Sequence, residues 1–207
     1  METDTRAELL RRADLDQAAR RSFKAHEAAA VDAANLPWLR ELVGRIGWPG
    51  HSVVGEDGAH AAWLLVQHAD ADPAFQRRCL ELLTAAAEQG QATRRQVAYL
   101  TDRVLIAEGA PQEYGTQVAG REGVWAPMSL GSPASVDARR EAMSLEPLAT
   151  YLARFEEVYG PPEPSSVPCP GCGADLEFWL AEPSADTELE CLACGETLRL
   201  NWRRGRP

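Results

Sequence analysis

Four of the five cysteines form two Cys-x-x-Cys pairs near the end of the chain. The pairs are Cys169 with Cys172 and Cys191 with Cys194, and 18 residues separate them. Zn²⁺ prefers four soft ligands in a tetrahedron, and a two-residue spacer lets one tight turn aim two thiolates at one ion. The separation is typical of zinc ribbons. The sequence therefore predicts one structural Zn²⁺ per chain, bound by these four thiolates.

Other uses of the cysteines fit the pattern less well. A redox site needs a single exposed Cys-x-x-Cys pair at the start of a helix. Disulfides are typical of exported proteins, and the charged N-terminal residues lack the apolar core of a signal peptide. We therefore expect a cytoplasmic protein. Because all four ligand positions are cysteines, no open coordination position remains, which argues against catalysis at this zinc.

A second set of residues with chemical potential lies among apolar helical segments. Its members are titratable or polar side chains: His68, Asp70, Asp102, Arg103, Tyr114 and Gln117. His60 and His68 cannot share one ion on a straight helix, because eight residues span about 12 Å. A metal site of His68, Asp70 and a distant group such as Asp102 stays open. In the structural alternative, His68 is hydrogen-bonded at a helix end and Asp72 caps the next helix.

The remaining members of this set also allow two interpretations. Asp102 and Arg103 lie beside apolar residues, so they either form a buried pair or face a pocket. Tyr114 lies in a segment, 111–118, that we expect to be a strand with alternating polar side chains. Gly115 within it indicates close approach of another element or of a ligand. This row either lines a small-molecule site or forms a hydrogen-bonded strand edge.

The hydrophobic pattern predicts a mainly α protein. Before residue 70 we expect a helical stretch, a short helix, a glycine-rich surface loop and a buried helix, over residues 5–34, 36–43, 46–58 and 59–69. Asp72 and Pro73 mark the start of a helix that ends at Gly90, and Thr93 with Gln96 forms a capping box for a helix ending near Gly109.

Two short strands, 111–118 and 123–128, then predict a small β-hairpin, and two more helices begin near Ser132-Pro133 and Glu146-Pro147. Residues 160–168 contain four prolines in nine positions, which is typical of a semi-rigid linker. We therefore divide the chain into a helical domain (1–159), this linker and a small C-terminal β zinc ribbon (169–207).

The ribbon sequence contains three strand-like segments, 175–180, 188–192 and 197–202. Its aromatic residues, Phe178, Trp179 and Trp202, are expected to form a small core rather than to stack on bases. Because a module of this size has little apolar area to bury, metal binding should supply much of its folding free energy.

The charge of the chain limits the classes of partner that the protein is expected to bind. The formal charge is −10, with 23 acids and 17 bases in residues 1–160 and 8 acids and 4 bases in residues 161–207. Such a surface disfavours nucleic acid and anionic membranes, and Arg203, Arg204 and Arg206 form only a short basic tail. No apolar run approaches the ~18 residues of a membrane span. We expect a protein partner or a small molecule instead.

The stretch from Trp63 to Gln117 carries several distinctive strings. An apolar run ends in Gln-His-x-Asp, and Leu-x-Asp-Arg and Pro-Gln-x-Tyr-Gly-Thr-Gln follow. Together with VDARREAMSLEPLATYL, these strings resemble a family of uncharacterised bacterial helical domains over residues 45–155, although Met143-Ser144 stands where that family commonly has glycine. The resemblance implies a mainly helical fold and no particular reaction.

Two functional classes therefore stay open. The first is a non-catalytic accessory or protein-interaction protein, indicated by the closed zinc site and the lack of nucleotide-binding or hydrolase motifs. The second is an enzyme acting on a small molecule in a pocket around His68, Asp102 and Tyr114. A nucleic-acid regulator fits the charge least. The fifth cysteine, Cys79, is expected in the core because it lies on an apolar helix face.

Overall fold

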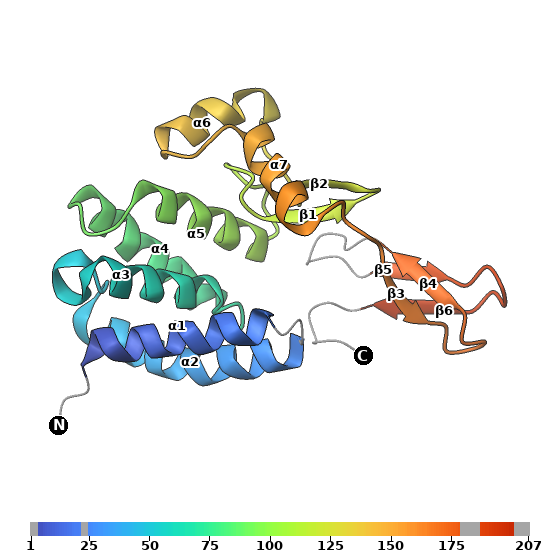
Figure 1. Ribbon diagram of the computed structural model, residues 1–207, viewed down its shortest axis with the longest axis horizontal. Coiled ribbons are helices and arrows are strands. Elements are labelled where there is room, and N and C mark those ends of the chain that lie inside the picture. Colours follow the sequence, from blue (N-terminus) through green and yellow to red (C-terminus); the bar gives the residue numbers. More distant parts are fainter. Residues whose placement is uncertain (1–3, 22–24, 179–186, 201–207) are drawn as a thin grey trace. The chain divides into compact units, whose positions relative to one another are not determined.

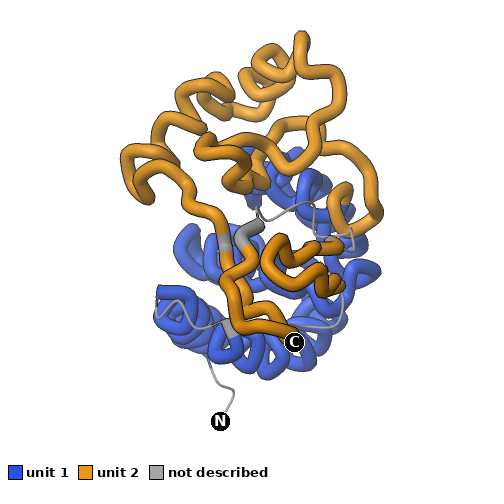
Figure 2. The backbone as a smooth tube through the Cα atoms, turned by 90° about the vertical axis from the view of Figure 1, so that its right-hand side faces the viewer, with its two compact units in different colours: residues 1–104 blue, residues 105–207 orange. Residues whose placement is uncertain are grey.

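A computed structural model describes residues 4–21, 25–178 and 187–200. The chain divides into two compact units, residues 1–104 and 105–207, which Figure 2 distinguishes by colour. The predicted fold class is confirmed, because helices dominate and the strands form only small antiparallel hairpins. Among the described residues, no helix is long and apolar enough to cross a membrane.

The described secondary structure of unit 1 is entirely helical (Figure 1). Its elements are α1 (Thr5–Arg21), α2 (Ala25–Ile46), α3 (His51–Gln67), α4 (Pro73–Glu88) and the greater part of α5 (Arg94–Ala107). Helix α1 packs against both α2 and α3. The core takes large apolar side chains from all five helices: Leu9, Leu39, Leu65, Leu83 and Leu100. Each stabilises the fold by about 2 kcal/mol through removal from water.

Two boundaries predicted for the first helices were wrong. Helix α2 continues through Pro37 to Ile46, so the short helix expected at 36–43 is the end of a longer one. The stretch expected at 5–34 is divided between α1 and α2, with 22–24 outside the described residues. A proline prevents only one backbone hydrogen bond, and packing of the apolar face of α2 outweighs that loss.

The glycine-rich segment 46–58 is not the surface loop that we expected. Helix α3 begins at His51, and Gly55 interrupts its helical geometry with φ +73° and ψ 170°. Glycine adopts this conformation without strain, so the helix kinks there instead of ending. Next to the kink, Asp57 accepts hydrogen bonds from Arg6 Nε and Nη2 at 2.9 and 2.5 Å, which ties α3 to α1.

The predicted helix caps in unit 1 are confirmed. The Asp72 carboxylate accepts a 3.1 Å hydrogen bond from the backbone N–H of Phe75 at the start of α4. At the start of α5, the Gln96 N–H donates to Thr93 Oγ1 at 3.2 Å and the Thr93 N–H donates to Gln96 Oε1 at 2.9 Å. Both caps satisfy donors that the helix itself leaves unpaired.

Unit 2 begins with the end of α5 and contains a hairpin of β1 (Val118–Arg121) and β2 (Val124–Pro127), in which Val118 pairs with Pro127. A 3₁₀ turn, η1 (Pro133–Ser135), precedes α6 (Val136–Ala142), and α7 (Leu148–Tyr159) follows. The strand expected over 111–118 was wrong: β1 starts only at Val118, and Gln112 makes an isolated bridge with Leu130.

The C-terminal segment forms two further hairpins. Strand β3 (Ser165–Pro168) pairs with β4 (Asp175–Phe178), and β5 (Thr187–Glu190) pairs with β6 (Thr197–Leu200). Residues of β3 therefore belong to the proline-rich segment that we expected to be a linker. Proline is tolerated there because β3 is the edge of a two-stranded sheet. The domain boundaries drawn from the sequence stay a prediction.

Gly115 and Gly109 provide a test of close packing in unit 2. Both have positive φ, +68° and +72°, but a Cβ at Gly115 would lie 3.2 Å from Pro127 and 3.3 Å from Leu148, whereas nothing lies within 4 Å at Gly109. We expect Gly109→Ala to lower the free energy of unfolding by about 1 kcal/mol and Gly115→Ala by at least about 2 kcal/mol. Urea denaturation measures both, and equal losses would show that the neighbours of Gly115 give way freely.

Candidate metal centre

The two cysteine pairs lie in turns with the same hydrogen bonding. In the first, Cys169 N–H donates to the Ala174 carbonyl at 2.8 Å and Gly173 N–H donates to the Cys169 carbonyl at 2.9 Å. In the second, Cys191 bonds to Glu196 at 2.8 Å and Gly195 to Cys191 at 2.7 Å. The glycine after each second cysteine, Gly173 and Gly195, has a positive φ, +75° and +76°. The two cysteine pairs therefore lie in equivalent turns, which we call knuckles.

The four sulfur atoms converge between the knuckles. Cys169 Sγ lies 3.5 Å from Cys194 Sγ, and Cys172 Sγ lies 3.6 Å from Cys191 Sγ. All four lie within 4.8 Å of one another. These separations far exceed the ~2.05 Å of a disulfide. They approach the roughly 3.8 Å edge of a tetrahedron with metal–sulfur bonds of about 2.3 Å. The donor set therefore fits a metal ion bound by four thiolates.

The surroundings of the sulfurs support metal binding. Cys169 and Cys191 are buried and pack with Leu176, while Cys172 and Cys194 are exposed. A hydrogen bond from the backbone N–H of Ala193 outweighs burial and lowers the pKa of Cys191 to about 7, whereas the pKa of Cys194 is raised to about 12, because the neighbouring thiols outweigh a hydrogen bond from the backbone N–H of Glu196. This small core also includes Val167, Ala174, Leu189 and Leu198.

The aromatic core expected for the ribbon falls outside what the structure describes. Trp179 and Trp202 lie outside the described residues, as do the arginines of the basic tail and the predicted ends of two strands. The side chain of Phe178 is likewise not described. In the described part of the ribbon, aliphatic side chains around two ligands form the core.

His68 lies in a cluster with two acids from other helices of unit 1. Its Nδ1 is 2.9 Å from Asp16 Oδ1, on α1, and 3.0 Å from Arg20 Nε. Arg20 also donates to Asp32 Oδ1, on α2, at 2.7 Å. Ligand atoms of Asp16, Asp32 and His68 lie close enough to hold one ion. The guanidinium of Arg20 contacts all three side chains and supplies one positive charge beside the two carboxylates.

Burial and partner charges act in opposite directions on the two acids of this cluster. The side chain of Asp16 is 1% exposed, and desolvation alone would raise its pKa. Hydrogen bonding and charge from His68, with help from Gln17 and Arg20, instead lower it to about 2. The pKa of Asp32 is raised, because burial outweighs the attraction of Arg20. Asp16 is therefore the stronger acid of the two and Asp32 the weaker acid.

The other candidates of unit 1 have separate environments. Asp70 does not join His68 as a ligand pair: it accepts from Arg103 Nε and Nη2 at 2.9 and 2.5 Å, and from Gln76 Nε2 at 3.1 Å. Asp102 is fully buried on α5. Cys79 is also fully buried, and burial raises its pKa to about 12, in keeping with the expected core position.

In unit 2, the candidate segment around Tyr114 is held by side chains that bond to its backbone. The buried amide of Gln112 accepts from Gln117 N–H at 2.8 Å and donates to the Gln117 carbonyl at 2.9 Å. Arg140 Nη1 donates to the Tyr114 carbonyl at 2.6 Å, and the hydroxyl of Tyr151 donates to the Thr116 carbonyl at 2.9 Å. Gly115 packs against side chains of the protein, which confirms the expected close approach of another element.

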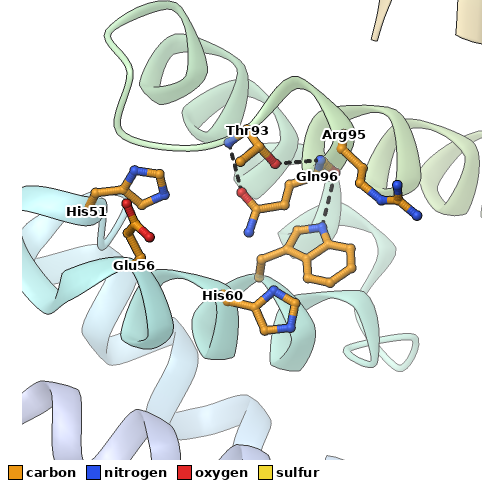
Figure 3. Close-up of a pocket in the computed structure, with 7 residues that line it drawn as sticks. His51, Glu56, His60, Thr93, Arg95 and Gln96 are labelled. Atoms are coloured by element: carbon orange, nitrogen blue, oxygen red, sulfur yellow. Dashed lines mark hydrogen bonds between the residues drawn. The ribbon is translucent and has the colours of Figure 1, made fainter. Parts of the chain in front are cut away.

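Sequence reasoning missed two features. The partners of His68 come from 36 and more residues away, and only the Asp16–Arg20 spacing on one helix gave a local signal. A second feature is a hollow in unit 1 between α3 and the start of α5, shown in Figure 3. Of its lining residues, the sequence had drawn attention to His60 and to the capping pair, each for another reason.

Asp16 makes the stability of unit 1 depend on pH. Its pKa is near 4 when unfolded and about 2 when folded, so its stabilisation is complete above pH about 4 and is lost as the pH falls toward 2. Asp16→Asn should lower the free energy of unfolding by about 2 kcal/mol near neutral pH, and by much less near pH 2.

Urea denaturation at several pH values measures this difference. Asp14→Asn, at an exposed position of α1, is the matched control and should change little. An equal loss for Asp16→Asn at pH about 7 and about 2.5 would contradict the assignment of Asp16 as the buried anion.

Comparison with known proteins identifies a family for most of the chain. No curated protein and no solved structure matches it. A family model matches residues 3–162, which include every helix of the described residues and end before Cys169. The four-cysteine centre therefore lies outside the matched part, and over residues 3–162 the chain belongs to a family of unknown function, DUF6624.

Proposed function

We propose that the chain is a non-catalytic accessory protein that carries a structural zinc ribbon and uses it to contact a protein partner. The convergence of four cysteine sulfurs carries this proposal. Four thiolates complete the tetrahedral shell of Zn²⁺, so no position is left for water or substrate. The ion then stabilises the knuckles and performs no chemistry.

The contacts of the distinctive polar residues support a non-catalytic role for the family domain. Arg140 is 1% exposed, donates to the carbonyls of Tyr114 and Glu146 and stacks 4.9 Å above the ring of Tyr151. Asp16 and Arg20 engage His68. Such groups stabilise backbone and buried charge, which is the ordinary reason for polar residues within apolar surroundings.

The surface of the ribbon supports a protein partner. Leu192, between the ligands of the second knuckle, is 100% exposed. Leu192 also lines a hollow of about 510 Å³, together with Asp175, Glu188 and Glu190 among other residues. Acidic groups repel phosphate backbones and attract basic protein surfaces. An exposed leucine with an acidic rim therefore fits a basic partner with an apolar anchor site.

Metal content tests the ribbon directly. Elemental analysis of the purified chain should give one zinc per chain, because each chain supplies a single set of four thiolates. Cys172→Ser removes one ligand and should abolish stoichiometric zinc. Cys79→Ala, which changes a cysteine of the helical core, should keep it. Full zinc in Cys172→Ser, or none in the unaltered chain, would contradict the proposal.

The docking role has its own test. Leu192→Asp should reduce co-purification of a specific partner by about tenfold or more, since losing a buried apolar anchor costs more than 1 kcal/mol. Val53→Asp, at an exposed position of α3, is the matched control and should retain the partner. Zinc content should stay the same in both variants. An unchanged set of bound proteins for Leu192→Asp would contradict docking at this knuckle.

A further inference from the structure

The buried cluster around His68 takes one potential metal ligand from each of the first three helices. Asp16 lies on α1, Asp32 lies on α2, and His68 is the C-cap of α3. Ligand atoms of all three lie within 4.8 Å of one another. An imidazole and two carboxylates are donors that first-row transition metal ions accept. The cluster therefore has the donor set of a cation site that shares no residue with the four cysteines.

The spacing of the donor atoms fits ligands of one ion. His68 Nδ1 lies 2.9 Å from Asp16 Oδ1 and 3.0 Å from Asp16 Oδ2. Neighbouring ligands of an ion lie roughly 3.0 to 3.4 Å apart when the metal–ligand bonds are about 2.1 Å. Gln17 Nε2 donates to Asp16 Oδ2 at 2.9 Å and so orients the carboxylate, as the outer partners of metal ligands do. Asp16 Oδ1 is therefore the better placed of the two oxygens to bind an ion.

The contacts of His68 Nδ1 within the cluster conflict with each other. This nitrogen faces Asp16 Oδ1, an acceptor, and the Nε–H of Arg20, a donor at 3.0 Å. If Nδ1 carries a proton, it donates to Asp16 but meets the N–H of Arg20. If it carries none, it accepts from Arg20 but its lone pair lies against the carboxylate. Either tautomer leaves one repulsive contact, and a cation bound to both Nδ1 and Asp16 removes it once Arg20 moves away.

Arg20 supplies the positive charge of this cluster and can give way to an ion. Its side chain is 32% exposed, compared with 1% for Asp16, 26% for Asp32 and 17% for His68. Because Arg20 is the outermost member, its guanidinium can turn into solvent without moving a helix. It brings one positive charge to two carboxylates, whereas a divalent ion brings two. The negative end of the α3 dipole, at His68, also favours a cation here.

We propose that Asp16, Asp32 and His68 bind one divalent first-row transition metal ion, which takes the place of the guanidinium of Arg20. The imidazole ligand disfavours Mg²⁺ and Ca²⁺, which prefer oxygen ligands. Three protein ligands leave the other coordination positions to water, so this ion exchanges more readily than one bound by four cysteines. Because the ligands belong to three helices, the ion stabilises the packing of α1, α2 and α3. The site lies within unit 1 and needs no residue of the zinc ribbon.

The test is a titration of the full chain, dialysed free of exchangeable metal, with Mn²⁺, following the electron paramagnetic resonance signal of the free ion. Thiolates bind Mn²⁺ poorly, so the cysteine centre does not compete for it. One Mn²⁺ per chain should bind with saturation, and it should raise the midpoint of thermal unfolding, because only the folded chain holds the three ligands together. Asp32→Asn should weaken binding by more than about tenfold, since loss of even an outer partner of a ligand has that effect. Asp14→Asn, at an exposed position, should not.

Arg20→Gln distinguishes a metal site from a cluster that serves only as an ion pair. Without the competing guanidinium, Mn²⁺ should bind about tenfold more tightly, and it should restore the thermal stability that the variant loses. An ion-pair cluster would lose stability and show no response to Mn²⁺. Arg21→Gln, an exposed neighbour, is the matched control and should bind like the unaltered chain. The proposal is overturned if the chain shows no saturable Mn²⁺ binding, if Asp32→Asn binds as tightly as the unaltered chain, or if Arg20→Gln gains no affinity.

Discussion

The carboxylate of Asp16 is almost completely removed from water, and the first three helices meet where it is neutralised. Leaving such a charge unpaired would cost several kcal/mol, so α1, α2 and α3 must keep Arg20 and His68 in place around it. Apolar burial supplies most of the stabilisation of unit 1. The ion cluster fixes how the three helices are aligned along their axes, because sliding any one of them by a turn would separate the charges.

Unit 2 is also ordered around a buried charged side chain, but here the charge is positive. Arg140 is buried on a short helix and donates to the backbone carbonyls of two segments, Tyr114 and Glu146, beneath the ring of Tyr151. Gln112 completes the arrangement by pairing with the backbone of Gln117 as a strand would. A segment with little regular secondary structure is thus ordered by side chains that bond to its backbone.

A structural feature was predictable from the sequence when the residues that form it are close together in the chain. Caps and knuckles were predictable, because Asp72 at a helix start or Gly173 after a cysteine acts on its immediate neighbours. The prediction of a strand at 111–118 was wrong because its backbone carbonyls accept from distant side chains, those of Arg140 and Tyr151, instead of from a neighbouring strand. The kink at Gly55 was missed for a related reason: a glycine that ends an isolated helix can be overridden by packing on both sides.

The cluster around His68 and the cysteine centre lie on different sides of the end of the family match. Asp16, Asp32 and His68 lie within residues 3–162, so a metal ion bound by them would belong to the part of the chain that defines family membership. The cysteine centre lies beyond that part. Its described core is a few aliphatic side chains around Cys169 and Cys191, which is too little apolar area to fold forty residues alone. We therefore expect folding of this centre to require a bound metal ion.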